Sequence, residues 1–149
     1  PKTHALDIYS IIHSSGVRQD RPVEQAYLQR SQEHDFTDYQ YCGDPNYEDI
    51  CVGTFAPSGP LVAYILGKRV GDHVQYDEIM GHHDHLRYDV MALTHFSFLC
   101  EALRRSPTPC CLNYGPWYSG NMPFSPDGGL NFWKRKHGFR PAYLVTECE

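Results

Sequence analysis

The sequence lacks several of the patterns that would place it at once in a common class of protein. Its 149 residues contain no run of about eighteen apolar residues, so a membrane-spanning helix is not expected. The six cysteines form no C-x-x-C pair and no regular framework, which argues against a zinc site built from cysteine. No H-E-x-x-H pattern occurs, and the first residues lack the basic-then-apolar order of a signal peptide. We therefore expect a cytoplasmic protein with reduced thiols.

The sequence also lacks an excess of positive charge. Thirteen basic and eighteen acidic residues give a net charge of −5, which argues against nucleic-acid binding through the whole surface. Between Leu103 and Arg140, however, the only acid is Asp127. The six basic residues of that part are Arg104, Arg105, Lys134, Arg135, Lys136 and Arg140. This basic C-terminal part predicts an anionic ligand, such as a nucleotide or nucleic acid, near that end of the chain.

Hydrophobic patterning in the first half predicts a strand, a helix and then a three-stranded meander. Residues 5–15 are rich in β-branched side chains and predict a strand, and residues 21–33 predict a helix that begins near a proline. Residues 50–57 and 60–70 are β-branched and aromatic runs that flank a short turn, which is typical of a hairpin. Residues 70–81 alternate imperfectly, in a pattern that predicts a third antiparallel strand.

The second half predicts two more helices and two more strands. Residues 89–105 carry apolar side chains three and four apart, which is typical of an amphipathic helix. The side chains expected in the core are those of Val90, Leu93, Phe96 or Ser97, Cys100 and Leu103. A strand at 110–117, a loop, a helix at 129–139 and a strand at 140–147 follow. We expect one α/β (α+β) domain over residues 1–149, with a mixed, mostly antiparallel sheet flanked by helices.

The stretch GHHDH, directly after the predicted meander, contains His82, His83 and His85. Three interpretations compete for it: a metal site, a ligand-binding or catalytic loop without metal, and a hydrogen-bonded structural loop. No other cluster in the sequence supplies a third or fourth metal ligand, so a tightly held metal is not expected. Because the segment joins a strand end to a helix start, we expect it to line a ligand cleft.

The tail NFWKRKHGFRPAYLV, residues 131–145, and the order of the elements resemble the GNAT superfamily of N-acyltransferases and its FemAB-like relatives. In that family a helix ending in a Y-x-x-x-G-F type motif runs into the final strand, and the counterpart here is KRKHGF. The resemblance covers roughly residues 49–145. It implies a sheet splayed between the strands at 70–81 and 110–117, and transfer of an acyl or aminoacyl group to an amine.

The resemblance also implies a role for the stretch GHHDHLRYD. In the family a turn of the form Q/R-x-x-G-x-G/A follows this strand, and its backbone N–H groups hold the pyrophosphate of acyl-CoA at a helix N-terminus. Here the turn has a single glycine, at its other end, and two acids, Asp84 and Asp89, so we expect acetyl-CoA to bind weakly. The implied donor-binding residues are Gly81, His82, His83, His85, Leu86, Arg87 and, from the last helix, Lys134.

The family often places an acidic general base on the strand that corresponds to residues 70–81, which implies Asp77 or Glu78. Because neighbours on a strand face opposite ways, only one of the two is expected to face the cleft, and Glu78 is favoured over Asp77. The alternative for both is an exposed carboxylate without a role. Since Lys134 stands where many members carry a tyrosine acid, Tyr114 and Tyr118 are the candidate proton donors.

Three further residues are candidates for binding the acceptor. In this fold the region of Arg18 and Arg21 shapes the acceptor pocket, and two guanidiniums hold a carboxylate or phosphate well. The alternative is a solvated turn with one ion pair to Asp20 or Glu24. Trp117 stacks on an aromatic ligand in one interpretation and caps the core in the other. Three functions compete: a transferase that uses acyl-CoA or another activated donor, an atypical transferase that modifies a nucleic-acid base or nucleotide, and a catalytically silent binding domain.

Overall fold

The computed structural model describes residues 2–18, 21–23, 25, 28, 46–105, 111–115 and 129–141, and every structural statement below concerns these residues. The chain forms two compact units, Pro1–Asn113 and Tyr114–Glu149. The expectation of a single domain over residues 1–149 stays a prediction. Within the described residues, no helix is both long enough and apolar enough to cross a bilayer.

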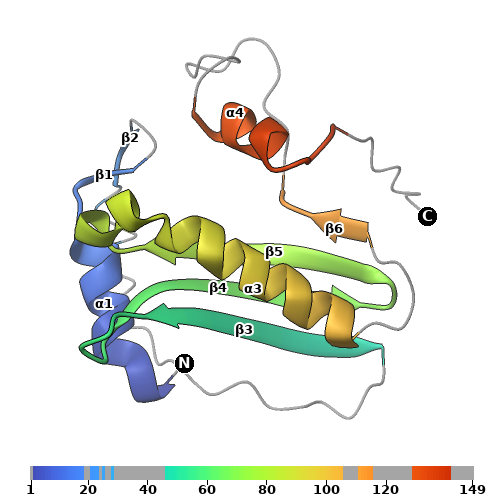
Figure 1. Cartoon of the computed structure of the whole chain (residues 1–149), viewed down its shortest axis with the longest axis horizontal. Coiled ribbons are helices and arrows are strands. Elements are labelled where there is room, and N and C mark those ends of the chain that lie inside the picture. The colour runs from blue at the N-terminus through green and yellow to red at the C-terminus, as the bar shows by residue number, and fades with distance from the viewer. Residues whose placement is uncertain are drawn as a thin grey trace. The chain divides into compact units, whose positions relative to one another are not determined.

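The first unit is built on a four-stranded sheet, which Figure 1 shows with its covering helices. Strands β3 (Tyr47–Phe55), β4 (Leu61–Val70) and β5 (His73–Gly81) form an antiparallel meander. Strand β6 (Cys111–Asn113) adds to the edge in parallel with β5. A mixed, mostly antiparallel sheet flanked by helices confirms the predicted α+β class and is consistent with a GNAT-like plan.

Two glycines make the tight turns of the meander. Gly59 lies between β3 and β4 with a φ of 109°, and Gly71 lies between β4 and β5 with a φ of 62°. Side chains other than glycine rarely adopt such positive φ angles, so these positions fix where each strand ends. The predicted hairpin at Gly59 and the third strand after Gly71 are both confirmed.

The first long element is a helix, and the strand predicted over residues 5–15 is wrong. A short 3-10 helix, η1 (Lys2–His4), leads into α1 (Ala5–His13). The buried residues of α1 are Ile8, Ile11 and Ile12. Their spacing of three and one places all three on one helical face, and burial of that face outweighs the β-propensity of isoleucine.

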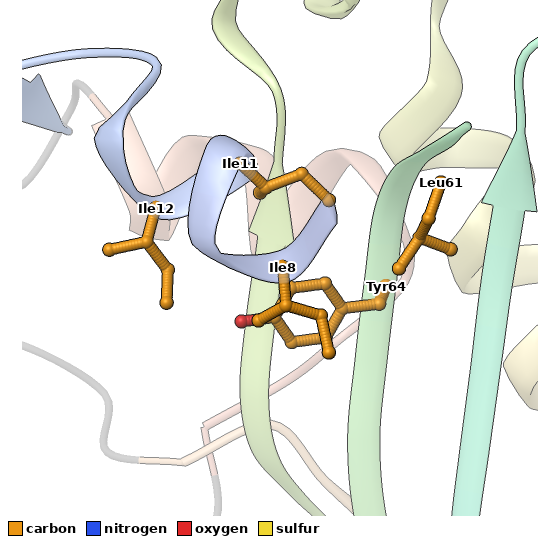
Figure 2. Packing of buried hydrophobic residues seen from close by; sticks show 5 residues of the cluster. All are labelled: Ile8, Ile11, Ile12, Leu61 and Tyr64. Atoms are coloured by element: carbon orange, nitrogen blue, oxygen red, sulfur yellow. The ribbon is translucent and has the colours of Figure 1, made fainter. Parts of the chain in front are cut away.

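Helix α1 covers one face of the sheet. Its three isoleucines pack with Leu61 and Tyr64 of β4, as Figure 2 shows, and Leu66 and Met80 border the cluster. Five residues form the centre of this cluster: Ile8, Ile11, Ile12, Leu61 and Tyr64. The cluster therefore anchors the N-terminal helix on the middle of the meander.

Helix α3 (Val90–Arg105) covers the opposite face and follows a short 3-10 helix, η2 (His83–Tyr88). Its buried residues are Val90, Thr94, His95, Phe98 and Ala102. The core face predicted from the sequence is therefore wrong apart from Val90. The exposed residues of the predicted face are Leu93, Phe96, Cys100 and Leu103, and Ser97 is half-buried.

Contacts with the sheet explain which face of α3 is buried. Phe98 lies against Gly67 of β4, where the missing side chain leaves room for an aromatic ring. The Thr94 and Thr54 hydroxyls are 2.7 Å apart, so the buried threonine has a polar partner on β3. Complementary shape and hydrogen bonding at the sheet thus override the more apolar stripe of the helix.

An ion-pair network ties the C-terminal end of α3 to the sheet. Arg105 pairs with Glu48 of β3 and with Glu101 of its own helix. Arg104 donates to Glu101 from Nε and Nη2 at 2.9 and 2.7 Å. These two arginines hold the pKa of Glu101 at about 2, well below the ordinary value of 4.5.

The second unit contains α4 (Gly129–Lys136), which lies within the helix predicted at 129–139 and ends three residues earlier. Gly138 has a φ of 84°, in the left-handed conformation common directly after a helix. The backbone N–H of Phe139 donates to the Lys134 carbonyl at 3.0 Å and closes the last turn. The Phe139 ring and the Trp133 ring both lie near Tyr114, at centroid distances of 5.1 and 5.2 Å.

Several predicted elements lie partly outside the described residues. At the start of the helix predicted over residues 21–33, Arg21–Pro22 instead form strand β2, paired with β1 (Val17–Arg18), while Gln25 and Leu28 are helical. The strand predicted at 140–147 lies outside the described residues after Pro141. Of the strand predicted at 110–117, β6 forms over Cys111–Asn113.

Candidate functional site

A bulge in β5 determines how its two adjacent carboxylates are presented. Leu66 of β4 pairs with Glu78, but the next residue, Gly67, pairs with Tyr76. Asp77 is therefore the extra residue of a β-bulge. An insertion of this kind disrupts strict alternation and turns the following side chain. The prediction that the two carboxylates face opposite ways, which assumed a regular strand, does not hold here.

Glu78 is held by a buried tyrosine. The Tyr64 hydroxyl donates to Glu78 Oε1 at 2.7 Å, and the Glu78 side chain is half-buried. Tyr64 itself is 3% exposed. Tyr76 packs against Phe98, at a ring-centroid distance of 4.5 Å, on the α3 face of the sheet. The bulge thus places Glu78 on the α1 face, although it lies only two positions after Tyr76.

Asp77 contacts side chains near the surface. Its Oδ1 lies 3.3 Å from Lys68 Nζ and accepts from Gln75 Nε2 at 3.2 Å. Lys68 and Tyr64 are four residues apart on β4, so they lie on the same face of the sheet. Both carboxylates therefore contact side chains on the same face of the sheet. The partner of Glu78 is buried, whereas the side chains of Asp77 and Lys68 are each more than a third exposed. Glu78 is the better fixed of the two.

Pairing between β5 and β6 ends before the bulge. Within the described residues β6 pairs only with His73, Val74 and Gln75 of β5. Glu78 lies three residues beyond Gln75, the last residue of β5 in this pairing. The splay predicted between these two strands stays a prediction.

The GHHDH stretch forms a capped 3-10 turn. His82 is the N-cap of η2, and its Nδ1 accepts from the Asp84 backbone N–H at 3.3 Å. The His82 backbone N–H donates to the Val62 carbonyl at 2.8 Å, and the His83 backbone N–H donates to Ser14 Oγ at 2.9 Å. The segment is thus fastened to β4 and to the end of α1.

These contacts differ from those of a phosphate-binding turn. The six-residue η2 stands between β5 and α3, and Asp89, with a φ of 55°, precedes the first residue of α3. Gly81 is buried, and a Cβ there would lie 2.5 Å from Met91 Sδ and 2.9 Å from Leu86 Cδ2. The glycine therefore makes room for the Met91 and Leu86 side chains.

The remaining side chains of the segment lie near the surface. The His82 and His85 rings make an edge contact at a centroid distance of 5.4 Å, and His83 is exposed. The Arg87 guanidinium stacks on Tyr88, 4.8 Å from the ring centroid. No group of three or more residues suited to hold a metal ion occurs among the described histidines, cysteines and carboxylates. A ligand-lining role for residues 81–87 stays a prediction.

In the second unit Lys134 is buried, although it belongs to the basic run KRK. The side chain is 2% exposed, and its Nζ lies 5.0 Å from the centroid of the Tyr114 ring. Burial lowers the pKa of Lys134 below its ordinary value. Burial also raises the pKa of Tyr114 above its ordinary value. Arg135 and Lys136 are exposed. Lys134 is therefore not part of the exposed basic surface of α4.

Four predicted site residues cannot be located by their side chains. The backbones of Arg18 and Arg21 pair in the small β1–β2 sheet. Trp117 and Tyr118 lie outside the described residues. Their assigned roles stay predictions from the resemblance.

Tyr64 and Ser14 are site residues that the sequence analysis missed. The register pairs Tyr64 with Met80, two pairs beyond Leu66 and Glu78. This register follows from the length of the turn at Gly71 and from one bulge, and only the turn is visible as a glycine in the sequence. The Ser14 contact joins residues 69 positions apart, and no local pattern predicts it.

Solved structures with a similar backbone include two acetyltransferases. One, from Bacillus cereus ATCC 14579, has a TM-score of 0.39 and 11% identity, and the match covers 54% of each chain, so this chain spans about half of that one. The other, from Trypanosoma brucei, has a TM-score of 0.46 and 11% identity, over 100% of this chain and 94% of that chain. No family model and no curated protein matches the sequence.

Proposed function

We propose that the chain is a GNAT-like acyltransferase that moves an acyl or aminoacyl group from an activated donor to an amine, with Glu78 as the general base. The carboxylate of Glu78, held at a β-bulge by a buried tyrosine hydroxyl, is the observation that supports this proposal. A general base must be fixed within hydrogen-bond reach of the proton it removes. The Glu78 side chain is fixed more firmly than that of Asp77, whose contacts are exposed.

In the proposed reaction the Glu78 carboxylate takes a proton from the amine, directly or through one water, while the nitrogen lone pair attacks the acyl carbon. The bond from the acyl carbon to the leaving group then breaks, and an acid returns a proton to the leaving group. Tyr114 and Tyr118 are the candidates for this acid. Burial raises the pKa of Tyr114, so this hydroxyl holds its proton more firmly than an ordinary tyrosine and is the weaker acid for it.

The residues after β5 do not fit the pyrophosphate of acyl-CoA in the way the family motif does. The position of Gly81 is filled by the Leu86 and Met91 side chains, and Asp84 and Asp89 add negative charge. We therefore propose an activated acyl donor and assign no carrier group to it. His82, His85 and Arg87 are proposed to contact the donor only at the outer surface of this turn.

Modification of a nucleotide or nucleic-acid base is the second candidate function. Exposed Arg135, Lys136 and Arg140 favour it, because clustered surface cations attract phosphate. The three other basic residues of that part of the sequence favour it less. Arg104 and Arg105 pair with carboxylates, and Lys134 is buried.

One screen separates the candidate functions. The full chain is incubated with acetyl-CoA, longer acyl-CoAs and aminoacyl-tRNA, each with a panel of small amines, amino acids and nucleosides, and products are identified by mass spectrometry. An N-acylated amine supports the proposed function, and an acylated nucleoside supports the second. A ligand-induced rise in melting temperature without any product indicates a silent binding domain.

A further inference from the structure

The hydroxyl of Tyr64 and the carboxylate of Glu78 form a contact between neighbouring strands. Tyr64 Oη donates to Glu78 Oε1 at 2.7 Å, a usual length for an O–H···O bond, and a charged acceptor strengthens such a bond. From this contact we infer that Tyr64 is a positioning residue, which fixes the Glu78 side chain for proton transfer. The inference rests on the proposed function for its catalytic part, but the positioning itself is testable without turnover.

The tyrosine is itself immobile. Its ring packs among Ile8, Ile11 and Leu61 in the cluster beneath α1, and Figure 2 shows the ring extending from β4 below Ile8 toward β5. Protein interiors are packed as tightly as molecular crystals, so this ring cannot change rotamer unless α1 moves. The hydroxyl oxygen is thus a fixed point beside the bulge.

A fixed donor matters because glutamate is a flexible side chain. A free glutamate samples many rotamers, and ordering it costs conformational entropy. At a bulge the strand no longer sets the direction of the side chain by simple alternation. The Tyr64 hydroxyl supplies that direction, so the carboxylate is ordered before a substrate binds, as efficient proton transfer requires.

A second buried tyrosine provides a matched control. Tyr76 of β5 is 7% exposed, and its hydroxyl lies 3.3 Å from His95 Nδ1 on the α3 face of the sheet. Both tyrosines therefore lie in the core and use the hydroxyl in a polar contact. The Tyr64 contact is made to Glu78, on the opposite face of the sheet.

The experiment compares Tyr64→Phe with Tyr76→Phe in the full chain, with glutamate side chains labelled by 13C. Both variants keep the ring and are expected to fold. We expect the Glu78 methylene couplings to average over several rotamers in Tyr64→Phe and to stay as in the unmodified protein in Tyr76→Phe. With an amine substrate, kcat should fall roughly tenfold in Tyr64→Phe while KM changes by less than about twofold.

The two arms of the experiment fail separately. If Glu78 keeps one rotamer in Tyr64→Phe, the positioning role is wrong whatever the activity shows. If Glu78 becomes mobile but no donor and amine react even with the unmodified protein, the proposed function is wrong and the positioning contact stands. If both variants lose kcat equally, the effect belongs to the core in general and the catalytic part of the inference is overturned.

Discussion

On the α3 face of the sheet, the Phe98 ring occupies the space that a side chain at position 67 would need. A Cβ at position 67 would lie 2.5 Å from the Gln75 carbonyl oxygen and 2.6 Å from Phe98 Cζ. The carbonyl belongs to the backbone of the neighbouring strand, so it cannot move aside as a flexible side chain does. At the scale of single residues, this glycine decides which residue of α3 enters the core.

We therefore expect Gly67→Ala to lower the free energy of unfolding by about 2–3 kcal/mol through overpacking. Urea denaturation followed by circular dichroism measures the change. Gly16→Ala is the control, because no atom lies within 4 Å of a Cβ built there, and it should have little effect. Equal stability of the two variants would mean that Phe98 does not pack against Gly67 as described.

The carboxyl group of Glu101 predicts a pH dependence of stability. Its folded-state pKa of about 2 is below the ordinary 4.5, so its contribution is present above about pH 4.5 and is lost as pH falls toward 2. Because the network is partly solvent-exposed, Glu101→Gln should cost only about 1 kcal/mol at pH 7. The difference between the two proteins should disappear near pH 2 in urea titrations at several pH values. A difference that stays constant across this range would rule out the ion-pair contribution.

At the scale of elements, helix α3 presents its two phenylalanines in opposite ways. Phe98 is fully buried against the sheet, and Phe96 is 66% exposed. Phe98→Ala should lower the free energy of unfolding by about 3–5 kcal/mol, because it removes a buried ring and leaves a cavity. Phe96→Ala, made as the matched control, should change it by less than about 0.5 kcal/mol. If Phe96→Ala proves to be the costly substitution, the helix is rotated relative to this description.

The elements differ in how well the sequence predicts them. The meander follows from two β-branched runs and from the glycines at its turns, which are local features. Helix α1 does not, because its three isoleucines favour a strand by propensity and a helix by spacing, and only packing on β4 decides between them. The buried face of α3 depends on the shape of the sheet at Gly67, which lies far away in the sequence.

The candidate site also contains residues that the sequence predicts and contacts that it does not. Glu78 could be proposed from its place near the end of a strand, but not its direction, since the bulge at Asp77 leaves no mark in the residue pattern. Tyr64 could not be proposed, because its contact with Glu78 depends on the pairing register of two strands. The histidines after β5 are visible in the sequence, whereas the cap by His82 and the tie to Ser14 require the folded chain.

At the scale of the whole molecule, the residues after β5 predict weak acetyl-CoA binding. The single glycine of this segment, Gly81, packs against the Met91 and Leu86 side chains, and two aspartates follow it. Isothermal titration calorimetry should give a dissociation constant weaker than about 100 µM, equivalent to less than about 5.5 kcal/mol of binding free energy. Binding at micromolar concentration or tighter would show that this turn holds the cofactor by contacts other than those of the family motif.

The measurement that tests the central claim most directly is the single-turnover rate of acyl transfer in two variants made side by side, Glu78→Gln and Asp77→Asn. Each removes one negative charge from the bulge and keeps the size of the side chain. If Glu78 is the base, Glu78→Gln should slow transfer by about a hundredfold or more at neutral pH, while Asp77→Asn stays within a few-fold of the unmodified protein. Equal rates for Glu78→Gln and the unmodified protein, or a larger loss in Asp77→Asn, would contradict the account.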